Sequence, residues 1–333
     1  MNGTVKRTLG VHAHTLAEIL FELACFFIYA SGMYFLISYL NRNKPVILMY
    51  HSVNHRDCPY VYPDNVITTE NFESQVKYLS RKKNVISLLE LLEHIENSTE
   101  FPPNAVVLTF DDGYSDFYTD AYPILRKYGS PCIIFLATKF LSSGEGKWED
   151  RLTCLIHMID SESFKINVGG KNIRFKASSK IEKRNSIKEL SSILSKTNDD
   201  DMCRIMKEIE RTAGNIRVSN QTMLKWSDVL LLKDSPLVSI GAHTHNHIDL
   251  GKASRELAKS EINRSKTDIE KIIKTRCCFF SYPLGKSKNF NSQTKTILKT
   301  EGIVAAVTTI PGNVHLGSDP LELRRIAAIN DAS

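Results

Sequence analysis

Two clusters of polar side chains in this 333-residue chain could carry out chemistry together. The first contains the adjacent carboxylates Asp111 and Asp112, within Thr109–Gly113. Adjacent carboxylates at a strand end point in different directions, so one could bind a metal ion while the other stays free as a base. An aspartate pair also suits a turn or a helix N-cap, so the pair alone leaves these uses open.

The second cluster contains three histidines at alternate positions, His243, His245 and His247. A continued strand would place all three on one face, and a loop after His243 could return His247 to the same ion. Two imidazoles and a carboxylate make the open-sided site that a catalytic Zn²⁺ or a similar divalent cation needs. The pattern therefore predicts a metal site, with His245 as the weakest of the three candidates.

Both clusters follow short apolar runs that are typical of buried strands. Amphipathic stretches at 71–96, 118–128 and 256–273 have the spacing of helices. Buried strands that alternate with helices predict an α/β fold with a parallel sheet or barrel, whose chemistry lies at the C-terminal strand ends. The runs expected to form strands are Val46–Tyr50, Ala105–Phe110, Cys132–Ala137, Val238–Gly241, Cys278–Tyr282 and Val304–Val307.

A third cluster, Phe280–Gly285, is a strand that runs into a Pro-Gly turn, which can hold a backbone N–H rigidly towards a reacting carbonyl. TFDDG at 109–113, HTHNH at 243–247 and SYPLG at 281–285 resemble, in this order, the first three motifs of the polysaccharide deacetylase family. This family is the NodB-homology group, carbohydrate esterase family 4. MYHSV at 49–53 and LRRI at 323–326 resemble its opening strand and its closing segment.

The resemblance implies a distorted (β/α)₇ barrel and metal-dependent hydrolysis of acetyl groups, usually N-acetyl groups on amino sugars. It implies that Asp111 is the catalytic base and that Asp112, His243 and His247 bind a divalent metal ion, for which we expect Zn²⁺. The backbone N–H of Leu284, where the family often has an aromatic residue, would stabilise the developing oxyanion together with the metal.

The chain departs from the family pattern near the expected site. Ser281 replaces the arginine that begins the family's third motif, and we expect Arg325 to orient Asp111 instead. The late motif that supplies the general acid is not recognisable, and His315 is the only histidine near that point. His51 could line the pocket or serve as a hydrogen-bonded structural histidine.

An apolar run of eighteen residues without a formal charge, 23–40, lies near the N-terminus. As a helix it would span about 27 Å, at the lower edge of what crosses a bilayer. An uncleaved anchor, an interfacial or re-entrant helix and a hairpin packed on the protein remain open. We predict an N-terminal hydrophobic helix within 1–44 that associates with a membrane through residues 15–40. A catalytic domain over 45–333, with a polar, partly helical insertion at about 145–222, would follow.

The charge balance does not suggest a nucleic-acid partner. The net charge is +6, and residues 161–225, with 14 Lys+Arg and 8 Asp+Glu, account for a surplus of that size. Seven cysteines without a CxxC pair argue against a disulfide framework or a cysteine-built zinc site. This cysteine usage favours a reducing compartment and hence the cytoplasmic face of a membrane.

Together these features predict a metal-dependent hydrolase that removes N-acetyl groups from amino sugars of a polysaccharide, oligosaccharide or glycolipid. An esterase for O-acetylated polysaccharides would use the same machinery. A glycan-binding protein that has lost turnover is the alternative from another class, although a binder has no need for a free carboxylate beside a metal.

Overall fold

The computed structural model describes residue 27 and residues 31–55, 58–143, 146–214 and 222–330. The chain divides into two compact units, and the second begins at Lys44. In the first unit, helix α2 (Met33–Leu40) leaves Leu36 and Leu40 exposed by 58% and 66%. No helix among the described residues is both long and apolar enough to cross a membrane. Much of the predicted 15–40 segment, at 15–26 and 28–30, lies outside the described residues.

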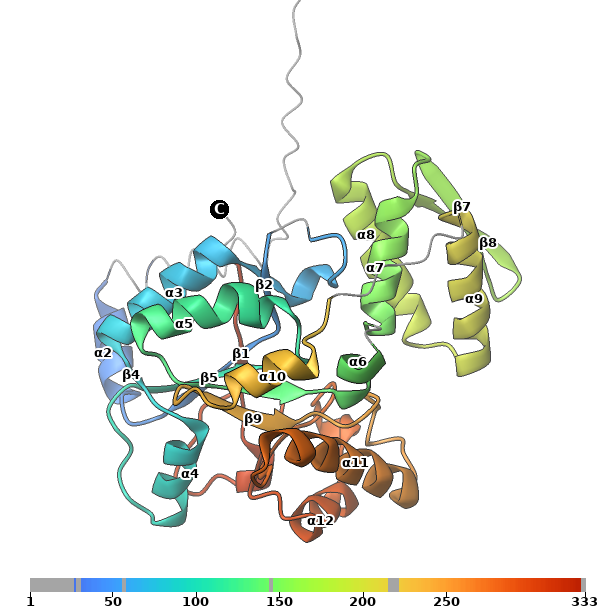
Figure 1. Cartoon of the computed structure of the whole chain (residues 1–333). Helices are drawn as coiled ribbons and strands as arrows, with labels where there is room; N and C mark the ends of the chain where they lie inside the picture. Colours follow the sequence, from blue (N-terminus) through green and yellow to red (C-terminus); the bar gives the residue numbers. More distant parts are fainter. Residues whose placement is uncertain (1–26, 28–30, 56–57, 144–145, 215–221, 331–333) are drawn as a thin grey trace, which may run out of the picture. The chain divides into compact units, whose positions relative to one another are not determined.

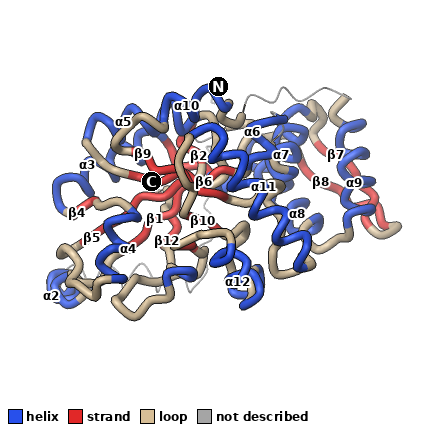
Figure 2. Tube along the Cα trace, turned by 60° about the horizontal axis from the view of Figure 1, so that its bottom comes forward, coloured by secondary structure: helices blue, strands red, loops and turns tan. Residues whose placement is uncertain are grey.

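Seven parallel strands of the second unit form one curled sheet in the order β11-β10-β9-β6-β5-β1-β12, and β4 (Asn84–Val85) pairs with β5 off this path. Figure 2 shows these strands gathered centrally with helices around them. The seven are β1 (Val46–Tyr50), β5 (Ala105–Phe110), β6 (Cys132–Leu136), β9 (Val238–Ala242), β10 (Phe279–Ser281), β11 (Ala305–Val307) and β12 (Ile326–Ala327).

The two edges of this sheet meet beside β12. The Leu323 N–H donates to the Ala306 carbonyl at 2.9 Å, and the Leu323 carbonyl accepts from the Thr308 N–H at 2.8 Å. Leu323 leads into β12 and Ala306 lies in β11, so these bonds join opposite edges of the sheet. The predicted α/β fold with a distorted seven-stranded barrel is confirmed.

Helices provide the crossovers that parallel strands require. Serine or threonine side chains cap the first turns of α3 (Thr69–Lys82), α4 (Leu88–Glu96) and α11 (Arg255–Ile273). The amphipathic stretch at 71–96, which has helical spacing, thus contains α3, β4 and α4. The remaining elements of this part are β2 (Ser52–Asn54), β3 (Val66–Thr68), π-helix η2 (Phe117–Ala121), α5 (Tyr122–Tyr128), α6 (Thr138–Ser143), α10 (Trp226–Leu232), α12 (Ser292–Thr300) and the 3₁₀ turns η1 (Pro63–Asn65), η3 (Ser287–Asn289) and η4 (Pro320–Glu322).

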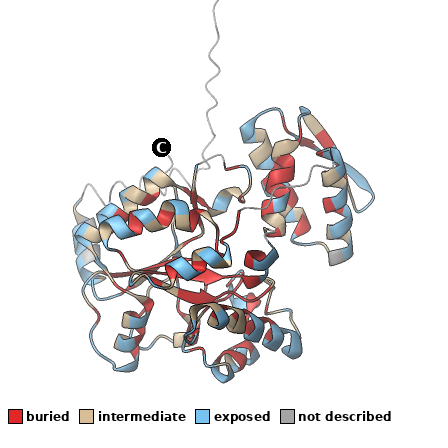
Figure 3. Ribbon diagram, viewed as in Figure 1, coloured by how far each residue is buried: buried red, intermediate tan, exposed pale blue. Residues whose placement is uncertain are grey.

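The strands send alternate side chains into two separate cores, because successive residues of a strand point to opposite faces. Leu108 and Phe110 of β5 pack in an outer core with residues of α3, α5 and α11. Ala105 and Val107 belong to an inner core with Phe135 and with residues of β11 and α4. Figure 3 shows the buried residues following the strands. A residue just past a strand end therefore faces the barrel interior when it lies an even number of positions after an inner-core residue of that strand.

Residues 146–214 form an insertion lobe with a core of its own. Its elements are α7 (Trp148–Met158), β7 (Ser163–Val168), β8 (Lys171–Lys176), α8 (Lys180–Leu194) and α9 (Asp199–Thr212) (Figure 1). Leu155, Phe164 and Leu190 are among its fully buried residues. The sequence analysis expects only a partly helical segment here. The structure adds an antiparallel hairpin, which the dipeptide Gly169-Gly170 between two six-residue strands could have revealed.

Candidate active site

The strand ends bring the predicted site residues together. Asp111 follows β5, His243 follows β9, and Ser281 ends β10. Asp111 lies an even number of residues after the inner-core residue Val107, and His243 lies two residues after Gly241, so each shares a face of its strand with that residue. A Cβ at Gly241 would lie 2.5 Å from the ring of the inner-core residue Phe135, so only glycine fits there. Strand alternation thus directs Asp111 and His243 into the barrel.

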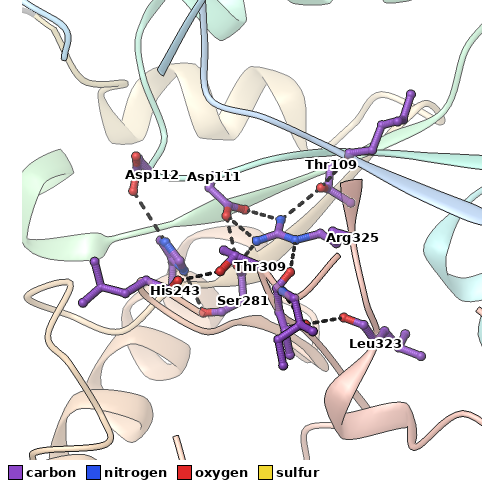
Figure 4. Close-up of polar contacts among 12 residues, drawn as sticks. Thr109, Asp111, Asp112, His243, Ser281, Thr309, Leu323 and Arg325 are labelled. Carbon is purple, nitrogen blue, oxygen red and sulfur yellow. Dashed lines mark hydrogen bonds and ion pairs between the residues drawn. The ribbon is translucent and has the colours of Figure 1, made fainter. Parts of the chain in front are cut away.

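Asp111 is held by a fork of hydrogen bonds from Arg325 (Figure 4). Arg325 donates from Nη1 to Asp111 Oδ1 at 2.8 Å and from Nη2 to Oδ2 at 2.6 Å. The Ser281 hydroxyl donates to Asp111 Oδ2 at 3.1 Å and accepts from Arg325 Nη2 at 3.0 Å. The structure therefore makes the contact that the sequence analysis expects of Arg325. Its effect on catalysis remains a prediction.

The pKa of Asp111 reflects two opposing influences. Burial alone would raise the pKa of this carboxyl group, but the guanidinium of Arg325 outweighs burial and lowers the pKa to about 2. Asp111 is therefore a carboxylate throughout the physiological pH range.

Asp112, His243 and His247 form the one group of potential metal ligands found among the described residues, with ligand atoms within 4.8 Å of one another. Asp112 Oδ1 lies 3.5 Å from His243 Nε2 and 3.4 Å from His247 Nε2. This Oδ1 is buried and has no hydrogen-bond partner. Because an orphaned buried carboxylate oxygen is costly, an oxygen that faces two imidazole nitrogens fits a bound cation. The three residues suit a divalent metal ion.

The imidazoles of this group are oriented as metal ligands would be. His243 Nδ1 lies 2.7 Å from the Ser281 carbonyl oxygen, which can only accept, so Nδ1 carries a hydrogen and Nε2 is the nitrogen that faces Asp112. Burial is the main cause that lowers the pKa of His247, to about 3, so this ring is neutral at pH 7. Two imidazoles beside one carboxylate are a common donor set for Zn²⁺.

Left-handed backbone conformations accompany the motifs. Asp112, Thr244, His247 and Leu284 have φ angles of 75°, 58°, 55° and 61°. Such values are uncommon for residues other than glycine and cluster at functional sites. The strained backbone turns Asp112 away from the direction of Asp111, as adjacent carboxylates with separate roles require.

Helix α11 holds the histidine loop. Glu261, which is buried, accepts from the Asn246 N–H at 2.7 Å and from Asn246 Nδ2 at 2.5 Å. His245 instead contacts Thr138, with 2.9 Å between Nδ1 and the hydroxyl oxygen, and does not belong to the potential metal-binding group. The weakest histidine candidate therefore has a structural environment.

Lys147 is the residue of the site that the sequence analysis misses. Its Nζ lies 2.5 Å from Asp112 Oδ2, and its side chain is 7% exposed. Burial would lower the pKa of Lys147, but the carboxylates of Asp112, Asp150 and Glu149 outweigh burial and raise it, so the amine is charged. The start of the insertion can be recognised in the sequence, but no local sequence pattern there indicates that Lys147 is buried.

Two other predicted site residues, Leu284 and His315, are more exposed than the Asp111 group. Leu284 occupies a turn in which its carbonyl accepts from the Thr309 hydroxyl at 2.6 Å, and its side chain is 47% exposed. The use of its N–H in catalysis stays a prediction.

His51 and His315, which lie outside the potential metal-binding group, differ in position. His315 is exposed, and its backbone N–H donates to Ser318 Oγ. The described residues show no contact between His315 and Asp111 or its partners. His51, by contrast, lies near Asp111 and Asp112. Burial lowers the pKa of His51, and the charges of the two aspartates partly offset this effect.

The comparisons with known proteins identify the family to which this curled parallel barrel belongs. The family model for polysaccharide deacetylase matches residues 98–306. Because this match covers more than half of the chain, the protein belongs to the polysaccharide deacetylase family. It is a carbohydrate deacetylase.

The similarity to individual relatives covers more of the chain than the three motifs alone. YxkH of Bacillus subtilis, named as a polysaccharide deacetylase, is 22% identical over 293 residues, which are 87% of this chain and 74% of that protein. The poly-β-1,6-N-acetyl-D-glucosamine N-deacetylase of Staphylococcus epidermidis is 27% identical over 113 residues, which are 31% of this chain and 39% of that enzyme.

Solved structures show the same fold. The Streptococcus pyogenes deacetylase PplD in complex with acetate has a TM-score of 0.54 and 22% identity, and the match covers 87% of this chain and 94% of that one. IcaB from Ammonifex degensii has a TM-score of 0.56 and 18% identity, with the same two coverages.

Proposed function

We propose that this protein is a divalent-metal-dependent deacetylase that hydrolyses N-acetyl groups on the amino sugars of a glycan or glycolipid. The observation that carries the metal dependence is the buried Asp112 Oδ1, which faces His243 and His247 without a hydrogen-bond partner. The choice of N-acetylated amino sugars is supported by relatives that are named as poly-β-1,6-N-acetyl-D-glucosamine N-deacetylases.

Asp112, His243 and His247 would hold the metal, and Zn²⁺ suits this donor set. When bound, such an ion supplies a Lewis acid that polarises the acetyl carbonyl and lowers the pKa of water in the site. The chain's own residues would then position the reactants and move the protons.

Asp111 would accept a hydrogen bond from the attacking water and take up its proton. Both Asp111 oxygens already accept from Arg325, but a carboxylate has about four lone-pair sites and retains room for water. Arg325 keeps the base charged and fixes its plane, and the Leu284 N–H would stabilise the negative charge that develops on the acetyl oxygen.

The leaving amine must receive a proton. His315 is the sequence-based candidate, but it is exposed and lacks a contact with the Asp111 group. His51 is the better-placed imidazole, because it follows β1 with inward parity and lies within electrostatic range of both aspartates. We propose that His51, in preference to His315, would pass to the amine the proton that Asp111 takes from the water.

We further propose that the protein works at a membrane surface, on a lipid-linked or surface-associated saccharide. The apolar run 23–40 and the positive surplus of 161–225 motivate this placement. The cysteine usage favours the cytoplasmic side of that membrane.

The function is tested by measuring acetate release from N-acetylglucosamine oligomers and from acetylated xylan with the Zn²⁺-loaded protein. We expect acetate and an equal amount of free amine from the oligomers. Acetate from xylan alone would instead assign an O-acetyl esterase. Binding of oligomers without any acetate would assign a catalytically silent glycan-binding protein.

A further inference from the structure

Lys147 enters the barrel site from the insertion lobe. It immediately precedes α7, and its Nζ forms an ion pair with Asp112 Oδ2 at 2.5 Å. Both side chains are buried, with exposed fractions of 7% and 0%. The lobe therefore contributes a charged group directly to a residue of the potential metal site.

The position of Lys147 is fixed by its neighbours. Asp150, in the first turn of α7, accepts from the Tyr62 N–H and from the Tyr114 hydroxyl, at 2.9 Å each. Lys147 Nζ lies 5.5 Å from the centre of the Tyr114 ring. These contacts anchor the start of the lobe to the barrel, so Lys147 is held where it meets Asp112.

The two oxygens of Asp112 consequently have different environments. Oδ2 accepts from Lys147, whereas Oδ1 faces His243 and His247 and has no hydrogen-bond partner. A carboxylate held in this way can offer a cation only one free oxygen. The ammonium also balances the negative charge of the carboxylate, so the net charge of the donor group is more negative by one unit without Lys147 than with it.

We propose that Lys147 is a positioning residue of the metal site, which commits Asp112 to ligation through Oδ1 and lowers the affinity of the site for a divalent cation. The inference rests on the proposed metal dependence. Lys147 restrains Asp112 geometrically and repels the cation electrostatically. The two effects oppose each other in metal affinity, and the charge effect is the larger because both groups are buried in a low-dielectric interior.

The test is the Zn²⁺ affinity of the metal-depleted full-length protein, measured by competition with a chelator of known affinity. Lys147→Met removes the charge and the donor, Lys147→Gln removes the charge but keeps a donor, and Lys147→Arg keeps both. We expect the two neutral variants to bind Zn²⁺ about tenfold or more tightly than the wild type, a change on the scale of outer-shell effects on metal sites. Lys147→Arg should stay close to the wild type. Lys165→Met, at an exposed lysine of the same lobe, is the matched control and should leave the affinity unchanged.

Each outcome decides one of the two ideas. A wild-type protein that does not bind Zn²⁺ would remove the proposed metal dependence itself. Zn²⁺ binding by the wild type, with neutral variants that bind equally or more weakly, would overturn the role of Lys147 alone. Neutral variants that cannot fold even with Zn²⁺ present would also overturn it, because a cation at Asp112 should replace the lost ammonium charge.

Discussion

Asp111 and Arg325 form a buried pair whose members lie 214 residues apart in the sequence. Arg325 is 1% exposed and donates four hydrogen bonds from its two terminal nitrogens, to Thr109, Ser281 and both Asp111 oxygens. Removal of one partner of a buried ion pair leaves the other charge uncompensated. The pair therefore links the stability of the protein to the protonation of its proposed base.

Arg325→Met should destabilise the protein by about 3–5 kcal/mol at pH 7. In the wild type the pKa of Asp111 lies at about 2, below its unfolded value, so this carboxylate stabilises the fold above about pH 4 and loses that effect as the pH falls towards 2. In the variant, burial without Arg325 should raise the pKa of Asp111 above the unfolded value. The difference in the free energy of unfolding between the two proteins should therefore be larger at pH 7 than at pH 4.

Urea unfolding at the two pH values measures this difference. Arg324→Met is the matched control, because Arg324 is the adjacent arginine and is exposed, and it should cost little at either pH. The acid limb of kcat/KM should also move to higher pH in Arg325→Met. A cost below about 1 kcal/mol that does not change with pH would contradict a buried charge pair.

At the scale of elements, Glu261 of α11 holds the loop that carries the proposed ligand His247. Glu261 accepts from the backbone and the side chain of Asn246, and the next residue is His247. Glu261→Gln should lower the Zn²⁺ affinity by about 10–100-fold, because an amide offers one acceptor oxygen to two donors and turns its own NH₂ towards one of them. This direction is opposite to that expected for the neutral variants of Lys147.

Glutamine is a good helix former, so α11 itself should persist in this variant. Glu256→Gln, at an exposed position of the same helix, serves as the control for a general loss of negative charge. Chelator competition on the two variants compares their Zn²⁺ affinities. Equal affinities would show that α11 does not position the loop.

The strands and their motifs could be predicted because each combines a local apolar pattern with a local polar end. Ala105–Phe110 and the aspartates after it are an example, and strand parity then directs Asp111 inwards. Long-range partners leave no such local signal. Lys147 and Glu261 look like ordinary solvated residues in the sequence, and only the packing of the lobe and of α11 buries them. Arg325 was found only because the resemblance supplied the missing partner of Asp111.

At the scale of the whole molecule, the membrane association remains a proposal with a direct test. Full-length protein should float with liposomes, and a variant without residues 1–44 should not. Leu36 and Leu40 are exposed on α2, and burial of each in lipid would contribute roughly 1.5–3 kcal/mol. The control variant Leu36→Asn/Leu40→Asn should therefore float less than the wild type. Equal flotation of the full-length and shortened proteins would contradict the proposal.

The insertion lobe and the barrel have separate cores, yet the lobe reaches the site through Lys147. Asp150 ties the start of the lobe to Tyr114 of the barrel. The barrel supplies Asp111 and Asp112 after β5 and the two histidines after β9. The insertion thus adds an electrostatic contact, from Lys147, to one carboxylate of the barrel.

The measurement that tests the account most directly combines metal content and acetate release in two variants of the Zn²⁺-loaded protein. Asp111→Asn should keep about one ion per chain and lose turnover of N-acetylglucosamine oligomers by at least about 10²-fold, since general-base catalysis contributes on that scale. His243→Ala should lose both the ion and the activity, because it removes a proposed ligand. Wild-type turnover in Asp111→Asn, or a wild-type protein that holds no metal, would contradict the assignment of base and ligands on which the proposed function depends.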